Sequence, residues 1–268
     1  MLVVGNERML MKTVWLSAIG ARDQDVQALF SKMKTYGLVV SGSPWIDDNK
    51  AMAWMGAREE MVKPQCALWA VLGSKNAFLN PETRYGLSLL SCCVQARRGS
   101  GIPMVILQTD AEKLSADDLP TPLRRAVVLP ALDGGTPAKL VAKVHAALPT
   151  FQSPYYLDMV GNPQFGQWFE VRPTQDEWAG IIFGVEEGEI KFQAVGPCGQ
   201  LPKNSTLNYP MQGLRMEIEG RTYSAWAVRN RITPESSYYI KVEGAPQSIL
   251  FGAFSEQNET EMFRVQLK

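Results

Sequence analysis

The sequence contains one histidine, His145, and four cysteines, none of them in a Cys-x-x-Cys pair. Zinc sites need closely spaced cysteine and histidine ligands, so this scarcity argues against a metal centre of that kind. Cys92 and Cys93 are neighbours and would face different sides of a helix, which leaves them poorly placed to bond to each other. We expect free thiols in a reducing compartment, which favours a cytoplasmic protein.

Long apolar runs and an excess of either charge are also missing. No run approaches the roughly 20 apolar residues of a membrane helix. The apolar opening, Met1 to Gly5, meets polar Asn6 at once and is too short for the core of a signal peptide. Residues 1–150 carry 17 basic and 13 acidic side chains, and residues 151–268 carry 10 and 14. Neither half is basic enough for a nucleic-acid binder, so we expect no membrane or nucleic-acid partner.

Three motifs of nucleotide and ester chemistry are absent. Neither GxxxxGK[ST] nor GxGxxG occurs, so the two common glycine-rich phosphate loops are missing. No GxSxG turn is present, and a serine triad would also need a histidine beside it. His145 is therefore expected to be an ordinary residue of a helix.

The first half alternates short apolar runs with segments of helical spacing. Asp23 is expected to cap the first helix, Gly37 to end it, and Ser41 to Pro44 to form a loop. Alternation of this kind predicts an open, mainly parallel, five-stranded flavodoxin-like sheet with helices on both faces, over residues 12–150. Residues 1–11 are an N-terminal extension. The expected strands are 13–18, 38–40, 66–72, 103–107 and 126–129, and the helices after the first are 52–61, 87–97 and 137–148.

The second half has a different texture, with short runs separated by glycine, proline and asparagine. Several runs alternate apolar and polar residues, and Glu187-Gly188 and Glu219-Gly220 are typical of hairpin turns. This pattern predicts a separate all-β, sandwich-like domain over residues 154–268, after a linker at 149–154. The expected strands are 155–160, 167–172, 180–185, 189–195, 213–219, 221–229, 237–242, 248–254 and 262–267.

Three segments of the first half carry a family resemblance. The strand Val14–Ala18 is followed by Arg22-Asp23 and a helix that ends at Gly37 before a second strand. Pro44-Trp45 follows that strand. Leu72-Gly73-Ser74 leads through Phe78 and Asn80 to Arg84-Tyr85-Gly86-Leu87. Over roughly residues 12–110 the chain resembles the TIR-like (Toll/interleukin-1 receptor homology) family.

That resemblance implies one of two roles. Some TIR-like domains associate with protein partners or with themselves, and others cleave NAD with a glutamate at the start of a helix. Gly86 occupies the matched position and carries no side chain, which favours association. Glu82 precedes Gly86 by one helical turn and is the candidate substitute carboxylate, although with Asn80 and Pro81 it also reads as a plain helix start. The nucleoside deoxyribosyltransferase-like group has a similar sheet and meets the same objection.

Six residues are candidate ligand contacts at the carboxyl edge of the sheet, where open α/β folds bind ligands. Tryptophan offers a stacking face, arginine a phosphate fork and serine a hydrogen bond. The alternative is that these residues cap helices, meet solvent or pack a loop. The six are Ser17, Arg22, Asp23, Trp45, Ser74 and Arg84.

The resulting hypothesis is an intracellular signalling or partner-binding protein, associating through the sheet edge and the Trp45 loop, with no required cofactor. NAD or another nucleotide is the expected small ligand. The alternative is an enzyme that cleaves an N-glycosidic bond of NAD or a nucleoside, with Glu82 as its catalytic carboxylate.

Overall fold

The computed structural model describes residues 12–99, 102–146, 153–254 and 261–268. The expected extension at 1–11 and most of the expected linker lie outside these residues. The domain boundaries proposed from the sequence therefore stay predictions. Among the described residues, no helix is both long and apolar enough to cross a membrane.

The first half folds around a parallel five-stranded sheet, as predicted. The strand order is β2-β1-β3-β4-β5. The strands are β1 (Thr13–Ala18), β2 (Val39–Pro44), β3 (Cys66–Gly73), β4 (Met104–Gln108) and β5 (Val127–Pro130). The central strand β3 is almost wholly buried, which explains its unbroken apolar sequence. A fold consistent with the flavodoxin-like and TIR-like class follows from this sheet.

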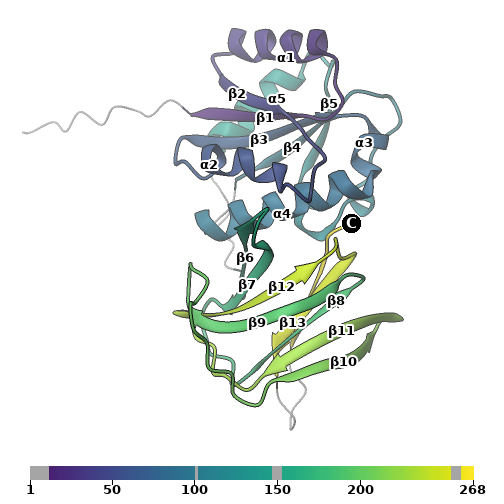
Figure 1. Cartoon of the computed structure of the whole chain (residues 1–268). Helices are drawn as coiled ribbons and strands as arrows, with labels where there is room; N and C mark the ends of the chain where they lie inside the picture. Colours follow the sequence, from purple (N-terminus) through teal and green to yellow (C-terminus); the bar gives the residue numbers. More distant parts are fainter. Residues whose placement is uncertain (1–11, 100–101, 147–152, 255–260) are drawn as a thin grey trace, which may run out of the picture.

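Helices cover both faces of the sheet (Figure 1). Apolar side chains from α1 (Asp23–Thr35) and α5 (Thr136–His145) pack on one face. On the other face pack the 3-10 helix η1 (Ala53–Ala57), α2 (Arg58–Met61) and α4 (Pro81–Arg98). The remaining short helices are α3 (Lys75–Leu79), η2 (Ala116–Asp118) and η3 (Thr121–Leu123).

Three local expectations were wrong. Asp23 is the first residue of α1 rather than its cap, and the capping position, Arg22, makes no capping bond through its side chain. Ser41 to Pro44 continue β2 because they pair with β1, which outweighs their loop-like composition. The single helix expected over 52–61 is η1 followed by α2, with Met52 left-handed at φ 53°. α4 begins at Pro81, the helix start that Asn80 and Pro81 indicate, and contains the expected run 87–97.

The second half is a β domain of two antiparallel sheets, and each of the nine expected runs forms a strand. One sheet has the order β10-β11-β8-β13-β14 and the other β6-β7-β12-β9. Both expected hairpin turns have positive φ at their two central residues, Glu187-Gly188 and Glu219-Gly220. The strands are β6 (Tyr155–Asn162), β7 (Gly166–Pro173), β8 (Ile181–Glu186), β9 (Glu189–Pro197), β10 (Met211–Ile218), β11 (Arg221–Val228), β12 (Ser236–Glu243), β13 (Ser248–Ala253) and β14 (Met262–Gln266).

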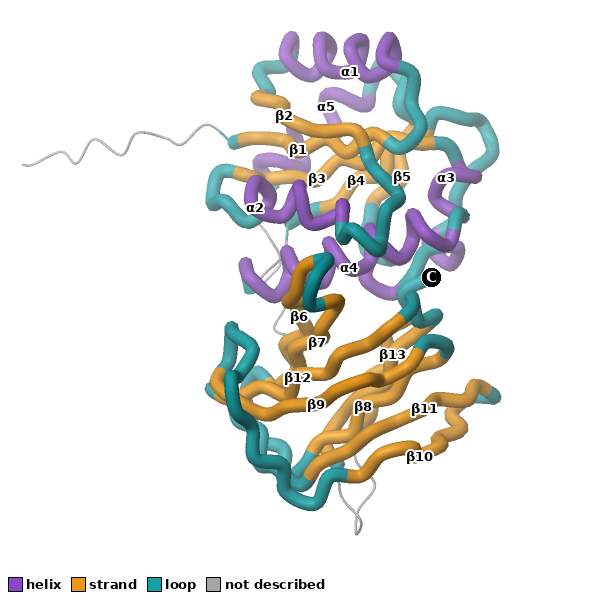
Figure 2. The backbone as a smooth tube through the Cα atoms, viewed as in Figure 1, coloured by secondary structure: helices purple, strands orange, loops and turns teal. Residues whose placement is uncertain are grey.

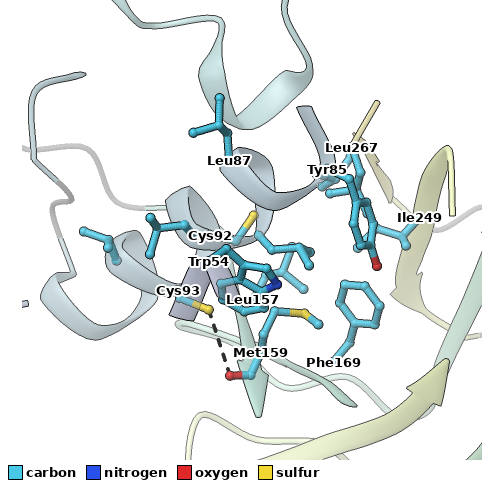
Figure 3. Close-up of a cluster of buried hydrophobic side chains, with 14 of the residues drawn as sticks. Trp54, Tyr85, Leu87, Cys92, Cys93, Leu157, Met159, Phe169, Ile249 and Leu267 are labelled. Carbon is cyan, nitrogen blue, oxygen red and sulfur yellow. Dashed lines mark hydrogen bonds between the residues drawn. The ribbon is translucent and has the colours of Figure 1, made fainter. Parts of the chain in front are cut away.

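Helix α4 lies between the parallel sheet and the β domain (Figure 2). Its side chains belong to one apolar cluster that also contains Met159 and Phe169 of the β domain (Figure 3). Ser88 Oγ donates a hydrogen bond of 3.0 Å to the Leu267 carbonyl. Cys93 Sγ lies 3.9 Å from the Met159 carbonyl, which it meets as a weak donor. The two halves therefore share a buried, hydrogen-bonded interface.

Candidate functional site

Side-chain caps set the course of the chain between β3 and α4. Ser74 Oγ accepts a hydrogen bond of 3.2 Å from the Ala77 amide and so caps α3. Asn80 Oδ1 accepts from the Glu82 amide at 2.9 Å and starts α4, with Pro81 in its first turn. The sequence identified both capping residues. For Ser74 this places the side chain in a cap rather than in a ligand cleft.

The loop after β2 lies across the first turns of α4. Trp45 Nε1 donates to Asp47 Oδ1 at 2.7 Å, and Thr83 Oγ1 donates to the other oxygen of Asp47 at 2.8 Å. Asn49 Nδ2 donates to Glu82 Oε2 at 2.7 Å and to the Glu82 carbonyl at 3.0 Å. The hydrogen bonds among these five residues hold the Trp45 loop against the helix.

Gly86 is buried beneath this loop. A Cβ atom at position 86 would stand 2.9 Å from Trp45 Cζ2 and 3.1 Å from Asn49 Oδ1. A carboxylate side chain could not point outward from this position unless Trp45 and Asn49 moved away. The place that the resemblance assigns to a catalytic glutamate is therefore filled by packed side chains.

Glu82 is exposed, and its carboxylate accepts the Asn49 amide. It lines neither of two well-formed cavities among the described residues. Stabilisation of a ribosyl cation is strongest where water is excluded and dipoles are fixed. Glu82 has a hydrogen-bond partner in Asn49, but its carboxylate is exposed to solvent.

The other candidates point to different places. Ser17 is 1% exposed and its Oγ accepts a hydrogen bond of 3.1 Å from Trp69 Nε1, within the core. Arg22 is exposed and pairs with Asp25 at 2.9 Å, while Asp23 is exposed on the first turn of α1. Ser17 and Arg22 both lie near the carboxyl end of β1, but one side chain points into the core and the other into solvent.

Arg84 turns away from the Trp45 loop. Its guanidinium donates to the Asp118 carbonyl at 2.7 Å and so ties α4 to η2. Its Nε is buried and has no hydrogen-bond partner among the described residues. Burial lowers the pKa of Arg84 below its ordinary value. A structural link is the role that these contacts support.

Two cavities among the described residues are candidates for a small molecule. One, of about 260 Å³, opens at the carboxyl edge beside α1 and is lined by Arg22, Asp25, Lys32, Thr109 and Leu132, among others. The other, of about 370 Å³, lies between α4 and the β domain and includes none of the six candidate residues. The first is below the usual range of roughly 300–1,000 Å³ for ligand pockets. Its lining carries the basic Arg22 and Lys32 and the acidic Asp25, which is already paired with Arg22.

A group of hydrogen-bonded polar side chains at the carboxyl edge of the parallel sheet was not predicted. Asp110, just after β4, accepts hydrogen bonds from the Lys75 amide at 2.8 Å and from the Gln108 side chain. Lys75 Nζ meets Glu112 Oε1 at 2.6 Å. The bond from Gln108, followed by that from the Lys75 amide, holds the pKa of Asp110 below its ordinary value. The acidic residues directly after the buried strand β4 were the sequence signal that could have predicted these hydrogen bonds.

No protein-family model matches the chain, and no curated protein matches it significantly. The TIR-like resemblance therefore identifies no family. What stands is the parallel five-stranded α/β sheet, of a kind consistent with the flavodoxin-like and TIR-like fold, joined to a β domain.

Proposed function

We propose that this protein acts by binding a protein partner and does not cleave N-glycosidic bonds. The observation that carries the proposal is the packing of Trp45 over Gly86. Trp45 Cζ2 lies 2.9 Å from the point where a Cβ on residue 86 would stand. Cleavage of this bond develops positive charge on the ribose carbon, and a nearby anion is the main means of stabilising it. At the matched position there is neither an anion nor the room for one.

The surroundings of Glu82 support the alternative function, cleavage of an N-glycosidic bond, only weakly. It shares a helix face with Gly86, but its side chain is exposed and bonded to Asn49. Moving it over a bound ribose would break that bond and displace the Trp45 loop. The network around Glu82 instead stabilises the loop, which is what a fixed recognition surface requires.

The β domain narrows where a partner can bind. It covers the outer face of α4, since Ser88 contacts Leu267 and Arg97 contacts Asp158. The end of the edge strand β2, residues 41–44, and residues 46–48 of the Trp45 loop are exposed. A nucleotide is a secondary ligand in this proposal, with its phosphate near Arg22 and Lys32.

The experiment that tests the proposal is incubation of the full chain at high concentration with NAD, and separately with purine and pyrimidine nucleosides. Liquid chromatography measures released nicotinamide or free base. We expect no release above a protein-free blank. Release by the wild type that disappears in Glu82→Gln would overturn the proposal and favour the N-glycosidase. Release that persists in Glu82→Gln but not in a boiled sample would also overturn it.

A further inference from the structure

The cavity between α4 and the β domain has no role in the proposed function. Its volume is about 370 Å³, within the usual range of roughly 300–1,000 Å³ for small-molecule sites, which often lie at domain interfaces. Cys92, Gln95 and Ala96 line it from the second half of α4, whereas the Trp45 loop crosses the first turns of that helix. The cavity is therefore a separate place for a ligand.

Hydrogen bonds between elements hold the walls of this cavity in place. Ser91 Oγ donates a hydrogen bond of 3.0 Å to the Pro122 carbonyl and so ties α4 to η3. The Gln266 amide donates to Thr121 Oγ1 at 3.0 Å and so ties η3 to β14. A ligand that enters a cavity with fixed walls has little rearrangement to drive, and this favours binding.

Tyr155, at the start of β6, brings a phenol to the cavity. Its ring is fixed against Phe251 and Phe263, with the ring centroids of each pair 4.9 Å apart. Cys92 and Arg125, which perturb its hydroxyl electrostatically, both line the cavity. Burial raises the pKa of Tyr155 to about 12, so the hydroxyl is protonated at neutral pH. Between described residues the structure contains no hydrogen bond to this hydroxyl, which leaves it able to donate to a ligand.

The guanidinium of Arg125 is the one formal charge among the described lining residues. A guanidinium has five N–H donors, so Arg125 can hold a ligand anion while it keeps other partners. Pro122, Leu157 and Val265 contribute apolar walls. The described lining therefore combines a cation and a phenol donor with apolar surface, and it includes no carboxylate.

We propose that this cavity binds a small molecule with one carboxylate and an apolar body, such as an aromatic acid or a medium-chain fatty acid. Arg125 and the Tyr155 hydroxyl hold the carboxylate, which accepts bonds from a guanidinium in a paired geometry. The apolar body lies against Pro122, Leu157 and Val265. Because the walls come from both halves of the chain, a bound ligand should also raise the thermal midpoint of the protein.

This inference goes beyond the proposed function, because a partner bound at the Trp45 loop would lie at the other end of α4. Carboxylate binding and nicotinamide release are separate measurements, and either can fail without the other. A ligand of this size makes few contacts. We therefore expect a dissociation constant on the order of 100 µM.

The test is isothermal titration calorimetry of the full chain with phenylpropanoate and with octanoate, each compared with its neutral amide. At least one acid should bind with one-to-one stoichiometry, and its amide should bind about tenfold more weakly because it lacks the charge. Tighter binding of phenylpropanoate would assign an aromatic ligand, and tighter binding of octanoate an aliphatic one. Binding of neither acid, or equal binding of acid and amide, would overturn the proposal.

Single variants test the position of the site. Arg125→Gln should weaken binding of the acid about tenfold, and Tyr155→Phe, which keeps the ring, about fivefold. Ala96→Phe fills the cavity and should abolish binding. Lys203→Gln removes an exposed cation from the loop after β9 and is the control that should leave binding unchanged.

Circular dichroism and the thermal midpoint without ligand establish that each variant is folded. Binding of the acid that Arg125→Gln leaves unchanged would overturn the proposal. Binding that persists in folded Ala96→Phe would overturn it as well, because the ligand would then lie outside the cavity.

Discussion

The indole of Trp45 lies over Gly86, with its Cζ2 atom 2.9 Å from the point where a Cβ on Gly86 would stand. These residues are far apart in the sequence and come together because the loop after β2 crosses the start of α4. The contact occupies the position where the resemblance places a catalytic carboxylate. It therefore bears on both the stability and the proposed function of the protein.

Gly86→Ala should destabilise the protein, although an interior helix position ordinarily gains about 1 kcal/mol from this change. The added methyl overlaps Trp45 and Asn49, and overpacking of this kind costs about 1–3 kcal/mol. We expect a net loss of about 1 kcal/mol in the free energy of unfolding, measured with urea. Gly86→Glu should lose more and should release no nicotinamide from NAD.

Gly56→Ala is the matched control. Gly56 is exposed in η1, and a Cβ there would meet no atom within 4 Å. It should leave the free energy of unfolding unchanged or raise it slightly. Adding Trp45→Ala should relieve Gly86→Ala, so the two changes should not be additive. If Gly86→Ala lowered the free energy of unfolding equally with Trp45 present and with Trp45→Ala, the overlap with Trp45 would be contradicted.

Local chemistry explains why much of the fold could be predicted from the sequence. Alternating residues with Gly188 and Gly220 at turns predict hairpins because only a few turn types suit twisted strands. Ser74 and Asn80 predict helix starts because their side-chain oxygens satisfy free amides. These signals act over a few residues, and at these positions no distant contact overrides them.

The arrangement of the site depended on contacts that are distant in sequence. Ser41 to Ser43 resemble a loop and become a strand only through pairing with β1. Tyr85 donates to Gln167 Oε1 at 2.9 Å, and no local pattern links these two residues. The resemblance directed attention to position 86. Only the three-dimensional packing showed that Trp45 fills the space there.

Thiol labelling should separate Cys198 from the other three cysteines. Cys198 is exposed, while Cys66, Cys92 and Cys93 are buried. Burial raises the pKa of Cys92 to about 12 and also raises the pKa of Cys66 and Cys93. At pH 8 a disulfide reagent should modify one thiol quickly in the native protein and four in denaturant. Cys198→Ser should abolish the fast phase.

The same pKa shifts predict a loss of stability at high pH. A thiol has a pKa near 8.5 in the unfolded chain, so the buried thiols stabilise the fold fully below that pH. Their contribution is lost as the pH rises from there toward the folded pKa of Cys92, about 12. Urea unfolding of Cys92→Ala should show a shallower decline over this interval than the wild type.

Asp110 should contribute to stability only above acidic pH. Because the Gln108 bond lowers its pKa, the contribution is complete above roughly pH 3.9, the unfolded value, and is lost as the pH falls through the folded value. Asp110→Asn should flatten the acid side of the stability curve measured by urea unfolding. Asp176→Asn, at an exposed position in the β domain, is the control for the substitution itself.

Arg97 and Asp158 join the two halves through a largely buried ion pair. Arg97 Nε lies 3.1 Å from Asp158 Oδ2, and the Asp158 side chain is 2% exposed while that of Arg97 is 36% exposed. Removing Arg97 leaves a buried carboxylate without its cation. We expect Arg97→Ala to cost about 2 kcal/mol in urea unfolding, below the full value for a buried pair because water screens the arginine.

Arg215→Ala is the matched control. It removes an arginine from a pair with Glu217 in which both side chains are mostly exposed, and it should cost less than about 0.5 kcal/mol.

Calorimetry of the wild type should show one transition, because α4 and the β domain share one apolar cluster. In Arg97→Ala that transition should broaden or divide as the interface weakens. Two separate transitions in the wild type would mean that the Arg97–Asp158 contact does not couple the halves.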